Sequence, residues 1–324
     1  MKMLLTFVLA FLVLDGAVFA QNADPERLKN EGNALYQAGS IDEAIAKWEQ
    51  AIQADSAYAF GFNNIGIALY DKKDYKGAAA SLEKAVAIDS TYAKAWNSLG
   101  NACLALGDAS RAREAFAASA RFEPKNAVTL ANLGNACLAL GDFNAALAAY
   151  DQSLDIDRNN VVALNNRGLI LQGASRFDEA IESFRQAIRA DSEFLDSYLN
   201  LGALYLSRPD PDGKFAQSAL DYFLRAQKMD AENPVTAYNL GLCYLAMKNS
   251  GRARLVLSEF VQKHPEDARA HYLLGHAYLQ SSMADQAVKS FTQAFALDRD
   301  FSEARIAIDA ATQMLAQPAP PAQN

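Results

Sequence analysis

Asparagine recurs at one place in a regularly spaced pattern, two residues before a glycine. Eight such places follow one another along the 324-residue chain, and asparagine fills six of them. In chain order the eight residues are Asn30, Asn64, Ser98, Asn132, Asn166, Asn200, Asn239 and Leu273. A carboxamide side chain has an acceptor oxygen and two donor hydrogens, so it can bond the C=O and the N–H of a peptide together. A row of such side chains could therefore hold an extended peptide by its main chain. The alternative is that each amide bonds to nearby backbone or to water.

No pattern of residues in the sequence indicates catalysis. The motifs of serine hydrolases, P-loop proteins, zinc proteases and dinucleotide-binding folds are all missing from it. His271 and His276 are five residues apart, which places them about 140° apart around a helix, so they do not share a face that could bind a metal. We expect His271 to pack in place of a large apolar residue and His276 to line a groove. The predicted protein is not an enzyme and needs no cofactor.

Cysteine occurs three times, and two of the cysteines lie in identical nine-residue stretches, GNACLALGD, at 100–108 and 134–142. Equivalent residues of stacked units are about 8–10 Å apart, whereas a disulfide requires Cα atoms within about 7 Å. Cys103 and Cys137 are therefore predicted to be unpaired, and Cys243 has no equivalent partner either. We expect all three thiols to be buried and reduced, so the repeated stretch marks a structural unit.

A fixed period organises the chain around these residues. The glycines that follow the asparagine row are 34 residues apart, with one interval of 39: Gly32, Gly66, Gly100, Gly134, Gly168, Gly202, Gly241 and Gly275. An alanine and then a large side chain come after most of them, as in Gly100, Ala112 and Phe116. Apolar residues three and four apart on either side of a Gly-Asp turn predict a helix–turn–helix unit. The small residues would let the two helices approach closely, and the large one would fill the gap to the next pair.

These units resemble tetratricopeptide (TPR) repeats, most clearly at Trp96, Leu99-Gly100, Ala112, Phe116 and Pro124. The resemblance implies an all-α, right-handed superhelical solenoid of stacked helix–turn–helix repeats with a C-terminal capping helix. Eight repeats are predicted within 21–301, at 25–58, 59–92, 93–126, 127–160, 161–194, 195–233, 234–267 and 268–301. The capping helix is expected over 302–317 and a disordered, proline-rich tail over 318–324.

The resemblance also implies a binding site, because the first helix of each TPR repeat lines a concave groove that the asparagine row would face. The row is similar to the asparagine ladder of the O-GlcNAc transferase superhelix. In addition, Lys29, Asn33, Asn64 and Lys94 match four of the five positions of the carboxylate clamp in chaperone-binding TPR domains, which grips a C-terminal carboxylate. Ser98 stands at the fifth position and removes one cation.

The middle of the predicted groove is apolar, because leucines stand four residues after the glycine in several repeats: Leu104, Leu138, Leu206 and Leu245. A hydrophobic peptide or an amphipathic helix could bind there, or the leucines could line the covered interior of a tight superhelix. The predicted function is a non-catalytic scaffold that binds peptide segments of other proteins in the groove. Two alternatives stay open: a structural component of an envelope assembly or secretion machine that uses its convex face, and a carbohydrate-binding protein.

The N-terminal twenty residues differ from the rest of the chain. Lys2 precedes the apolar run Leu4–Leu14, and small residues lead up to Ala20. This is typical of a secretory signal peptide, since the run is too short to span a bilayer comfortably. It predicts cleavage after Ala20, export to a periplasm or outside the cell, and no stable membrane insertion afterwards; an uncleaved anchor is the alternative. The net charge of −8 disfavours nucleic acid as a partner.

Two local departures from the repeat pattern are visible. Glu31 and Arg167 replace the apolar residue before the glycine, which predicts locally weaker repeats. The sixth repeat has five additional residues within Ser207–Lys214, where two prolines and a glycine predict a turn.

Overall fold

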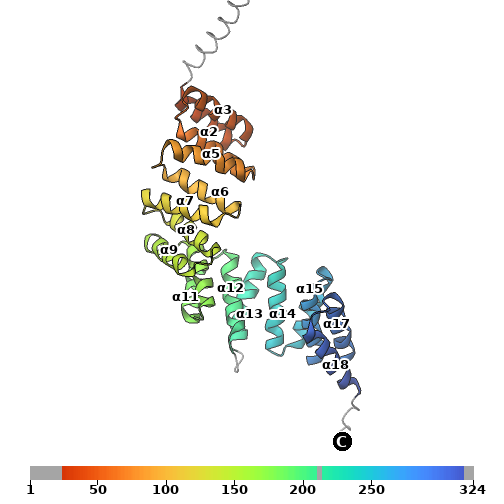
Figure 1. Ribbon diagram of the computed structural model, residues 1–324. Helices are drawn as coiled ribbons and strands as arrows, with labels where there is room; N and C mark the ends of the chain where they lie inside the picture. Colours follow the sequence, from red (N-terminus) through yellow and green to blue (C-terminus); the bar gives the residue numbers. More distant parts are fainter. Residues whose placement is uncertain (1–23, 210–213, 317–324) are drawn as a thin grey trace, which may run out of the picture. The chain divides into compact units, whose positions relative to one another are not determined.

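The computed structural model of the protein describes residues 24–209 and 214–316. Every regular element within these residues is an α-helix, which confirms the predicted all-α class (Figure 1). The helices are α2 (Pro25–Gln37), α3 (Ile41–Ala54), α4 (Ala59–Asp71), α5 (Tyr75–Ile88), α6 (Ala93–Ala105), α7 (Ala109–Phe122), α8 (Ala127–Ala139), α9 (Phe143–Ile156), α10 (Val161–Gly173), α11 (Phe177–Ala190), α12 (Leu195–Ser207), α13 (Lys214–Met229), α14 (Pro234–Ala246), α15 (Ser250–Lys263), α16 (Ala268–Gln280), α17 (Ala284–Leu297) and α18 (Ser302–Ala316). The predicted signal peptide and C-terminal tail lie outside the described residues.

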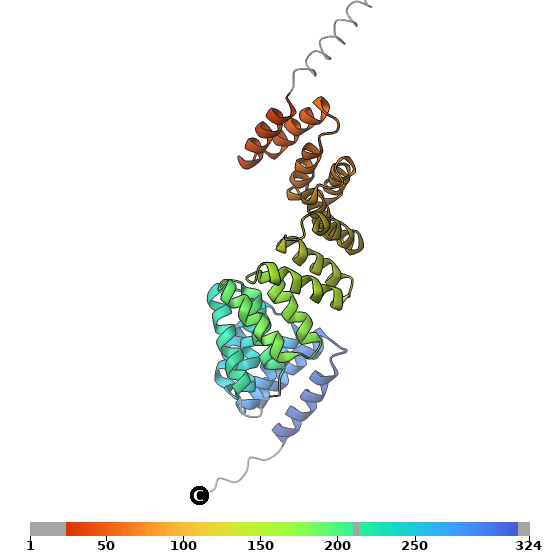
Figure 2. The same ribbon diagram turned by 90° about the vertical axis from the view of Figure 1, so that its left-hand side faces the viewer.

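Each predicted repeat contains one pair of helices, from α2 and α3 to α16 and α17. Helix α18 follows as a single helix where the capping helix was expected (Figures 1 and 2). It packs on α17 through small side chains that are fully or almost fully buried, namely Ala304, Ala307 and Ala311. No helix in the described part of the chain is long and apolar enough to cross a membrane.

The turns inside the helix pairs follow from their sequence. Gly107 and Gly141 have φ angles of 78° and 74°, in the left-handed region that glycine adopts without steric cost. The aspartate that follows each glycine caps the second helix: Asp108 accepts a hydrogen bond from the backbone N–H of Arg111, and Asp142 from that of Ala145. The Gly-Asp pairs thus end one helix and begin the next, as predicted.

The large side chain of each repeat lies on the glycine of the same repeat. A Cβ atom added to Gly100 would come within 2.6 Å of the Phe116 ring, and one added to Gly134 within 2.5 Å of the Tyr150 ring. The other six repeats have the same arrangement, with Trp48, Leu82, Phe184, Phe223, Leu257 or Phe291 over the glycine. Phe116 also shares a core cluster with Ala136 of the next repeat. The predicted contact with the neighbouring repeat is therefore one part of its role, and closing its own helix pair is the other.

Glu31 and Arg167, the two polar residues that precede a repeat glycine, each bond to a side chain on the second helix of their own repeat. Glu31 forms an ion pair with Lys47, with a distance of 2.7 Å between the Oε2 and Nζ atoms. Arg167 donates a hydrogen bond of 2.7 Å from Nη1 to Oγ of Ser183. The partner is sixteen residues further along in both cases, so a polar bridge between the two helices stands where the other repeats have leucine or isoleucine.

The chain divides into two compact units, residues 1–166 and 167–324, where the sequence predicted one uninterrupted array. Unit 1 and unit 2 below denote their described residues. The division falls within α10, directly before Arg167. In unit 1 the first helices of successive repeats, α2, α4, α6 and α8, contact one another in order, as do α12, α14 and α16 in unit 2. We call the surface that these helices form the first-helix face of each unit.

The insertion of the sixth repeat separates α12, which ends at Ser207, from α13, which begins at Lys214. Residues 210–213 of the predicted turn lie outside the described residues. Beside them, the guanidinium of Arg208 lies over the ring of Phe215, 4.6 Å from its centroid.

Candidate functional site

Three pairs of asparagine side chains connect neighbouring repeats on the first-helix face of unit 1. In each pair the Nδ2 atom of an asparagine of the predicted row donates to the Oδ1 atom of the asparagine that follows the glycine of the preceding repeat. The pairs, donor first, are Asn64 and Asn33 at 3.0 Å, Asn132 and Asn101 at 3.5 Å, and Asn166 and Asn135 at 2.8 Å. We call them the amide pairs.

Neighbouring side chains hold the amide pairs in place. Asn63 donates from Nδ2 to Oδ1 of Asn64 at 3.2 Å, and Asn165 does the same to Asn166 at 3.3 Å. The hydroxyl of Tyr150 donates to Oδ1 of Asn135 at 2.7 Å. Burial raises the pKa of Tyr150 to about 12, so the phenol keeps its proton and remains a donor at neutral pH. The first and third amide pairs are thus oriented before any ligand arrives. In the second pair the Nδ2 atom of Asn132 is shared between Asn101 and the Oδ1 atom of Asn97, which lies 3.4 Å away.

Hydrogen-bonding capacity remains on these amides. Within the described residues, the Nδ2 atoms of Asn33, Asn101 and Asn135 donate to no protein group. The Oδ1 atom of Asn63 is buried and has no hydrogen-bond partner, and the side chain as a whole is 4% exposed. A buried amide oxygen without a donor is costly unless a ligand or water supplies one. The Asn63 oxygen is out of reach of a surface ligand, so the face offers the three unused amide donors to a bound molecule.

The remaining positions of the predicted row behave differently. Ser98 and Ile67 stand where a fourth amide pair would form between the second and third repeats, so the series is interrupted there. Asn30 is exposed, and Asn200 is half-buried in α12. Asn239 donates from Nδ2 to the backbone oxygen of Val235 at 2.8 Å, inside α14. The amide pairs thus belong to unit 1, and the row alone did not reveal Asn101 and Asn135 as partners, although the Gly-Asn dipeptides mark them.

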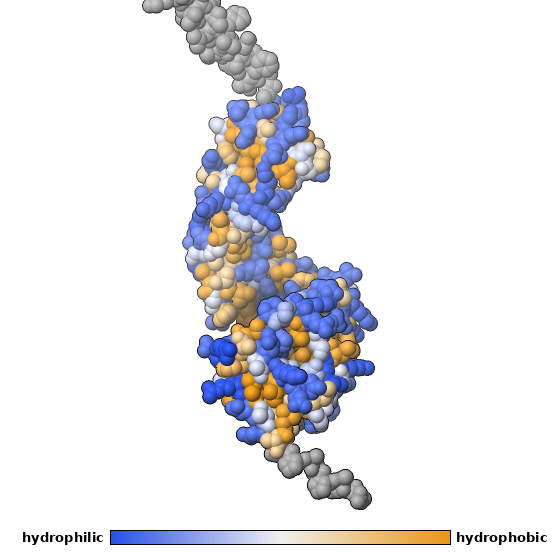
Figure 3. Space-filling model, turned by 90° about the vertical axis from the view of Figure 1, so that its right-hand side faces the viewer, coloured by the Kyte–Doolittle hydropathy of each residue, from blue (hydrophilic) through white to orange (hydrophobic). Residues whose placement is uncertain are grey.

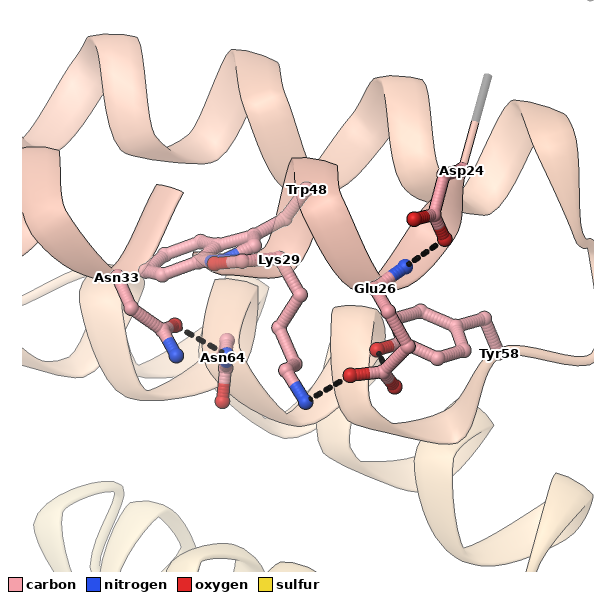
Figure 4. Close-up of polar contacts among 7 residues, drawn as sticks. All are labelled: Asp24, Glu26, Lys29, Asn33, Trp48, Tyr58 and Asn64. Atoms are coloured by element: carbon pink, nitrogen blue, oxygen red, sulfur yellow. Dashed lines mark hydrogen bonds and ion pairs between the residues drawn. The ribbon is translucent and has the colours of Figure 1, made fainter. Parts of the chain in front are cut away.

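The structure brings three of the four predicted clamp residues together, as Figure 4 shows for Lys29, Asn33 and Asn64. The ammonium group of Lys29, however, forms an ion pair with Glu26 and lies over the ring of Phe60, 5.4 Å from its centroid. Lys94 is exposed. A ligand carboxylate would have to compete with Glu26 for Lys29.

Glu26 is itself held by a second donor. The hydroxyl of Tyr58 donates to its Oε1 atom at 2.6 Å, and the hydrogen bonds from Lys29 and Tyr58 lower the pKa of the Glu26 carboxyl. Burial and the neighbouring Glu26 carboxylate raise the pKa of Tyr58. Lys29, one of the two cations of the predicted clamp, is thus already neutralised by a carboxylate of the same helix.

The predicted apolar middle of the groove is only partly covered. Leu104 and Leu138 are half-buried, whereas Ala105 and Ala139 beside them are exposed. Hydrophobic patches, orange in Figure 3, interrupt the hydrophilic surface on the face that the figure draws. Tyr36, an aromatic residue near the N-terminal end, donates its hydroxyl to Asp71, and this bond together with partial burial raises its pKa to about 12.

An aromatic cluster surrounds His276 in the last repeat of unit 2. The His276 ring lies edge-on to Tyr272 and Phe291, with centroid distances of 4.5 Å and 5.1 Å, and burial lowers its pKa. His276 thus packs within an aromatic cluster rather than simply lining a groove. His271 bonds through Nε2 to the backbone oxygen of Pro265 at 3.1 Å, six residues back, as Trp96 bonds to Ser90. His271 therefore substitutes for a large residue, as predicted.

The cysteines are buried and unpaired, as predicted, with exposed fractions of 0% for Cys103, 3% for Cys137 and 0% for Cys243. Burial raises the pKa of each thiol, that of Cys243 to about 12. Across 24–209 and 214–316, the His, Cys, Asp and Glu side chains form no group of three that could hold a metal ion.

Protein-family models match most of this chain. Models described as TPR repeat match residues 32–73 and 66–107. Models described as tetratricopeptide repeat match residues 93–126, 127–160, 165–234 and 238–300. One curated protein, the BBSome complex member BBS4 of Xenopus tropicalis, is 30% identical over 87 residues. That match covers 27% of this chain and 17% of the relative, so the chain spans about a sixth of the length of the curated relative.

Solved structures share the fold at low sequence identity. YrrB, described as a TPR protein with an unusual peptide-binding site, matches with a TM-score of 0.54 and 22% identity, over 61% of this chain and 99% of YrrB. PilF of Pseudomonas aeruginosa matches with a TM-score of 0.56 and 21% identity, over 67% of this chain and 96% of PilF. The APC/C hetero-tetramer Cut9–Hcn1 matches with a TM-score of 0.57 and 16% identity, over 88% of this chain and 55% of the matched chain.

Proposed function

Because this chain belongs to the tetratricopeptide repeat family, whose fold mediates protein–protein interactions, we propose that unit 1 binds an extended peptide segment of another protein. The amide pairs hold the main chain of that segment on the first-helix face. The protein acts as a scaffold and catalyses no reaction.

The observation that carries this proposal is the unused capacity of the amide pairs. An extended peptide presents N–H and C=O groups that the ladder hydrogen bonds of a sheet would otherwise satisfy. The Nδ2 atoms of Asn33, Asn101 and Asn135 can donate to its carbonyl oxygens. Because the amides are already fixed by their neighbours, little side-chain entropy is lost on binding.

Recognition of the main chain makes binding tolerant of the peptide's sequence. Each hydrogen bond contributes about 0.5–1.5 kcal/mol net, so a few such bonds give a weak and reversible complex unless other contacts add to them. YrrB shows that this fold can carry a peptide-binding site; the residues that would form one here come from this chain alone.

The test uses peptides selected on the full chain from a random dodecapeptide phage library and then titrated by fluorescence anisotropy. The double variant Asn132→Ala/Asn166→Ala removes the donors of two amide pairs, and we expect it to weaken binding at least tenfold while the helical circular dichroism is retained. Methylation of the peptide's backbone nitrogens should weaken binding to a similar extent, because the added methyl groups keep the main chain from approaching the amides closely.

The matched control is Asn239→Ala, which changes the same repeat position in unit 2, where the amide bonds inside its own helix. It should leave the affinity unchanged. If no peptide is enriched, or if Asn132→Ala/Asn166→Ala binds peptides as the unchanged protein does, the amide pairs do not form the binding site. Variants of the convex face would then be examined for a role in an envelope assembly.

Export remains part of the proposal. A cleaved signal at residues 1–20 would place the mature chain in a periplasm or outside the cell, so the bound segment would belong to an exported protein. The N-terminal sequence of the protein recovered from the producing cells tests this, with residue 21 as the expected first residue.

A further inference from the structure

A hollow opens at the edge of the first-helix face of unit 1, beside the fourth repeat. It has a volume of about 580 Å³ and is lined by the segment 123–128 and by Ile156 at the end of α9. Val128 is 60% exposed and Ile156 is 43% exposed, so two aliphatic side chains face solvent here. Together with Pro124 and Ala127 they make most of the lining apolar. We call this hollow the edge pocket.

The loop that forms the edge pocket is fixed in place. Asn126 caps α8 by accepting a hydrogen bond from the backbone N–H of Thr129 at 3.1 Å, and its Nδ2 atom donates to Glu123, also at 3.1 Å. Pro124 restricts the backbone further. The pocket is therefore formed in the unbound protein and does not depend on the ligand to shape it.

The edge pocket lies in line with the amide pairs. On α8, Asn132 comes four residues after Val128, and Asn135 comes three residues after Asn132. This spacing puts the three side chains on one face of the helix. Asn132 and Asn135 belong to two different amide pairs. A main chain held on these amides would pass one helical turn from the pocket, close enough for one of its side chains to enter.

The lining of the edge pocket carries no net charge, although the chain as a whole has a charge of −8. Along the face of α8 that includes Val128, the neighbouring side chains Ala131, Asn132 and Asn135 are all neutral. At the rim, Glu123 and Lys125 have opposite signs. A charged side chain would lose hydration among the apolar side chains of this pocket, whereas an aliphatic one would cover exposed carbon.

We propose that the edge pocket receives one large aliphatic side chain of the bound segment, which selects extended, uncharged peptides with a leucine, isoleucine or methionine at that place. This inference rests on the proposed peptide binding by the amide pairs and adds sequence selectivity to it. The amide pairs hold the main chain, and the edge pocket fixes its register.

The experiment compares the peptides that the random dodecapeptide library yields on the full chain and on the variant Val128→Asp. Because Val128 is largely exposed, the substitution leaves the core intact, and circular dichroism checks this. Peptides from the unchanged protein should share one large aliphatic residue within an uncharged stretch. Replacing that residue by alanine should weaken binding about tenfold or more, and Val128→Asp should remove that dependence.

The control is Val235→Asp in unit 2. Val235 stands at the equivalent place in the seventh repeat, beside a smaller hollow of about 280 Å³ whose lining includes the charged residues Asp267 and Arg269. We expect this variant to select the same peptides as the unchanged protein.

The outcomes separate the two proposals. If Asn132→Ala/Asn166→Ala abolishes binding while Val128→Asp leaves both the affinity and the selected sequences unchanged, the role of the edge pocket is refuted and main-chain binding stands. If the selected peptides have a charged residue at the shared position, the pocket has been assigned the wrong chemistry. If neither variant affects binding, both proposals fall.

Discussion

Units 1 and 2 have the same helix pairs and different first-helix faces. In both units a large side chain lies on a glycine of its own repeat, as Phe116 does in unit 1 and Phe223 in unit 2. The residue after that glycine is asparagine in three repeats of unit 1, whereas in unit 2 it is Leu169, Ala203, Leu242 or His276. The amide pairs therefore form only in unit 1.

This difference shows that two sets of positions in a repeat are free to change independently. The glycine and the ring that covers it are constrained by close packing, because a Cβ atom would overlap the ring. The next residue faces the surface that the first helices share, so either polar or apolar side chains are accepted there. The fold is thus held constant while the recognition surface varies, and the predictions below test each half of that statement.

The largest effect is expected when the shared packing is removed. Phe116→Ala and Phe223→Ala should each destabilise their unit by about 3–5 kcal/mol, since both rings are fully buried and leave a cavity. Urea denaturation followed by circular dichroism measures this loss. The control Phe143→Ala, at a ring that is 56% exposed, should change stability by no more than about 0.5 kcal/mol. Clearly unequal losses for the two buried rings would show that the units are not packed alike.

An intermediate loss of stability is expected when the asparagine after the glycine is replaced by leucine, the residue that two repeats of unit 2 have there. Asn135→Leu takes the acceptor from the buried hydroxyl of Tyr150 and should cost about 1–3 kcal/mol. Asn101→Leu breaks an amide pair without leaving a buried hydroxyl alone and should cost at most about 1 kcal/mol. Thermal unfolding of the two variants decides the matter. Equal losses would mean that the bond from Tyr150 does not stabilise the pair.

The smallest effect is expected when the pH is lowered. It should differ between the units, because all three histidines lie in unit 2. Burial lowers the pKa of His276 in the folded protein, so its stabilising contribution is present above about pH 6.5, the unfolded value, and is lost as the pH falls through the lowered folded value. Protection factors from hydrogen exchange in α16 should therefore fall between pH 7 and pH 5.5, while those in α8 hold.

Two variants provide the control for that measurement. His276→Phe should abolish the acid sensitivity of α16, because a phenyl ring can keep the edge-on contacts and has no proton to gain. His264→Gln should leave it unchanged. If α16 still loses protection in acid in the His276→Phe variant, a group other than His276 is responsible.

The sequence was sufficient to predict the helix pairs, because the glycine and the large side chain that covers it lie sixteen residues apart in almost every repeat and need no long-range information. It also predicted the row that contains Asn64, Asn132 and Asn166. It did not predict their partners, since the pairing joins residues 31 positions apart on two different helices and depends on how neighbouring helix pairs stack. The edge pocket was missed for the same reason, because α9 supplies Ile156 to a loop that precedes α8.

The clamp shows a different limit. Lys29, Asn33 and Asn64 lie together in the structure, but the match to the clamp pattern takes no account of neighbouring charges. Glu26 is three residues before Lys29 on the same helix, a spacing at which opposite charges meet. Attention to that neighbour in the sequence would have anticipated that the cation is neutralised.

One consequence of the ring-on-glycine packing concerns how such a chain can change in length. Since each helix pair closes on itself, a duplication of 34 codons adds a complete pair without disturbing the interior of its neighbours. The identical stretches at 100–108 and 134–142 are the trace that such an event leaves. Duplication of the fourth repeat, which has both Asn132 and Asn135, would also add an amide pair, so unequal recombination in the gene could lengthen the peptide-holding surface in whole steps.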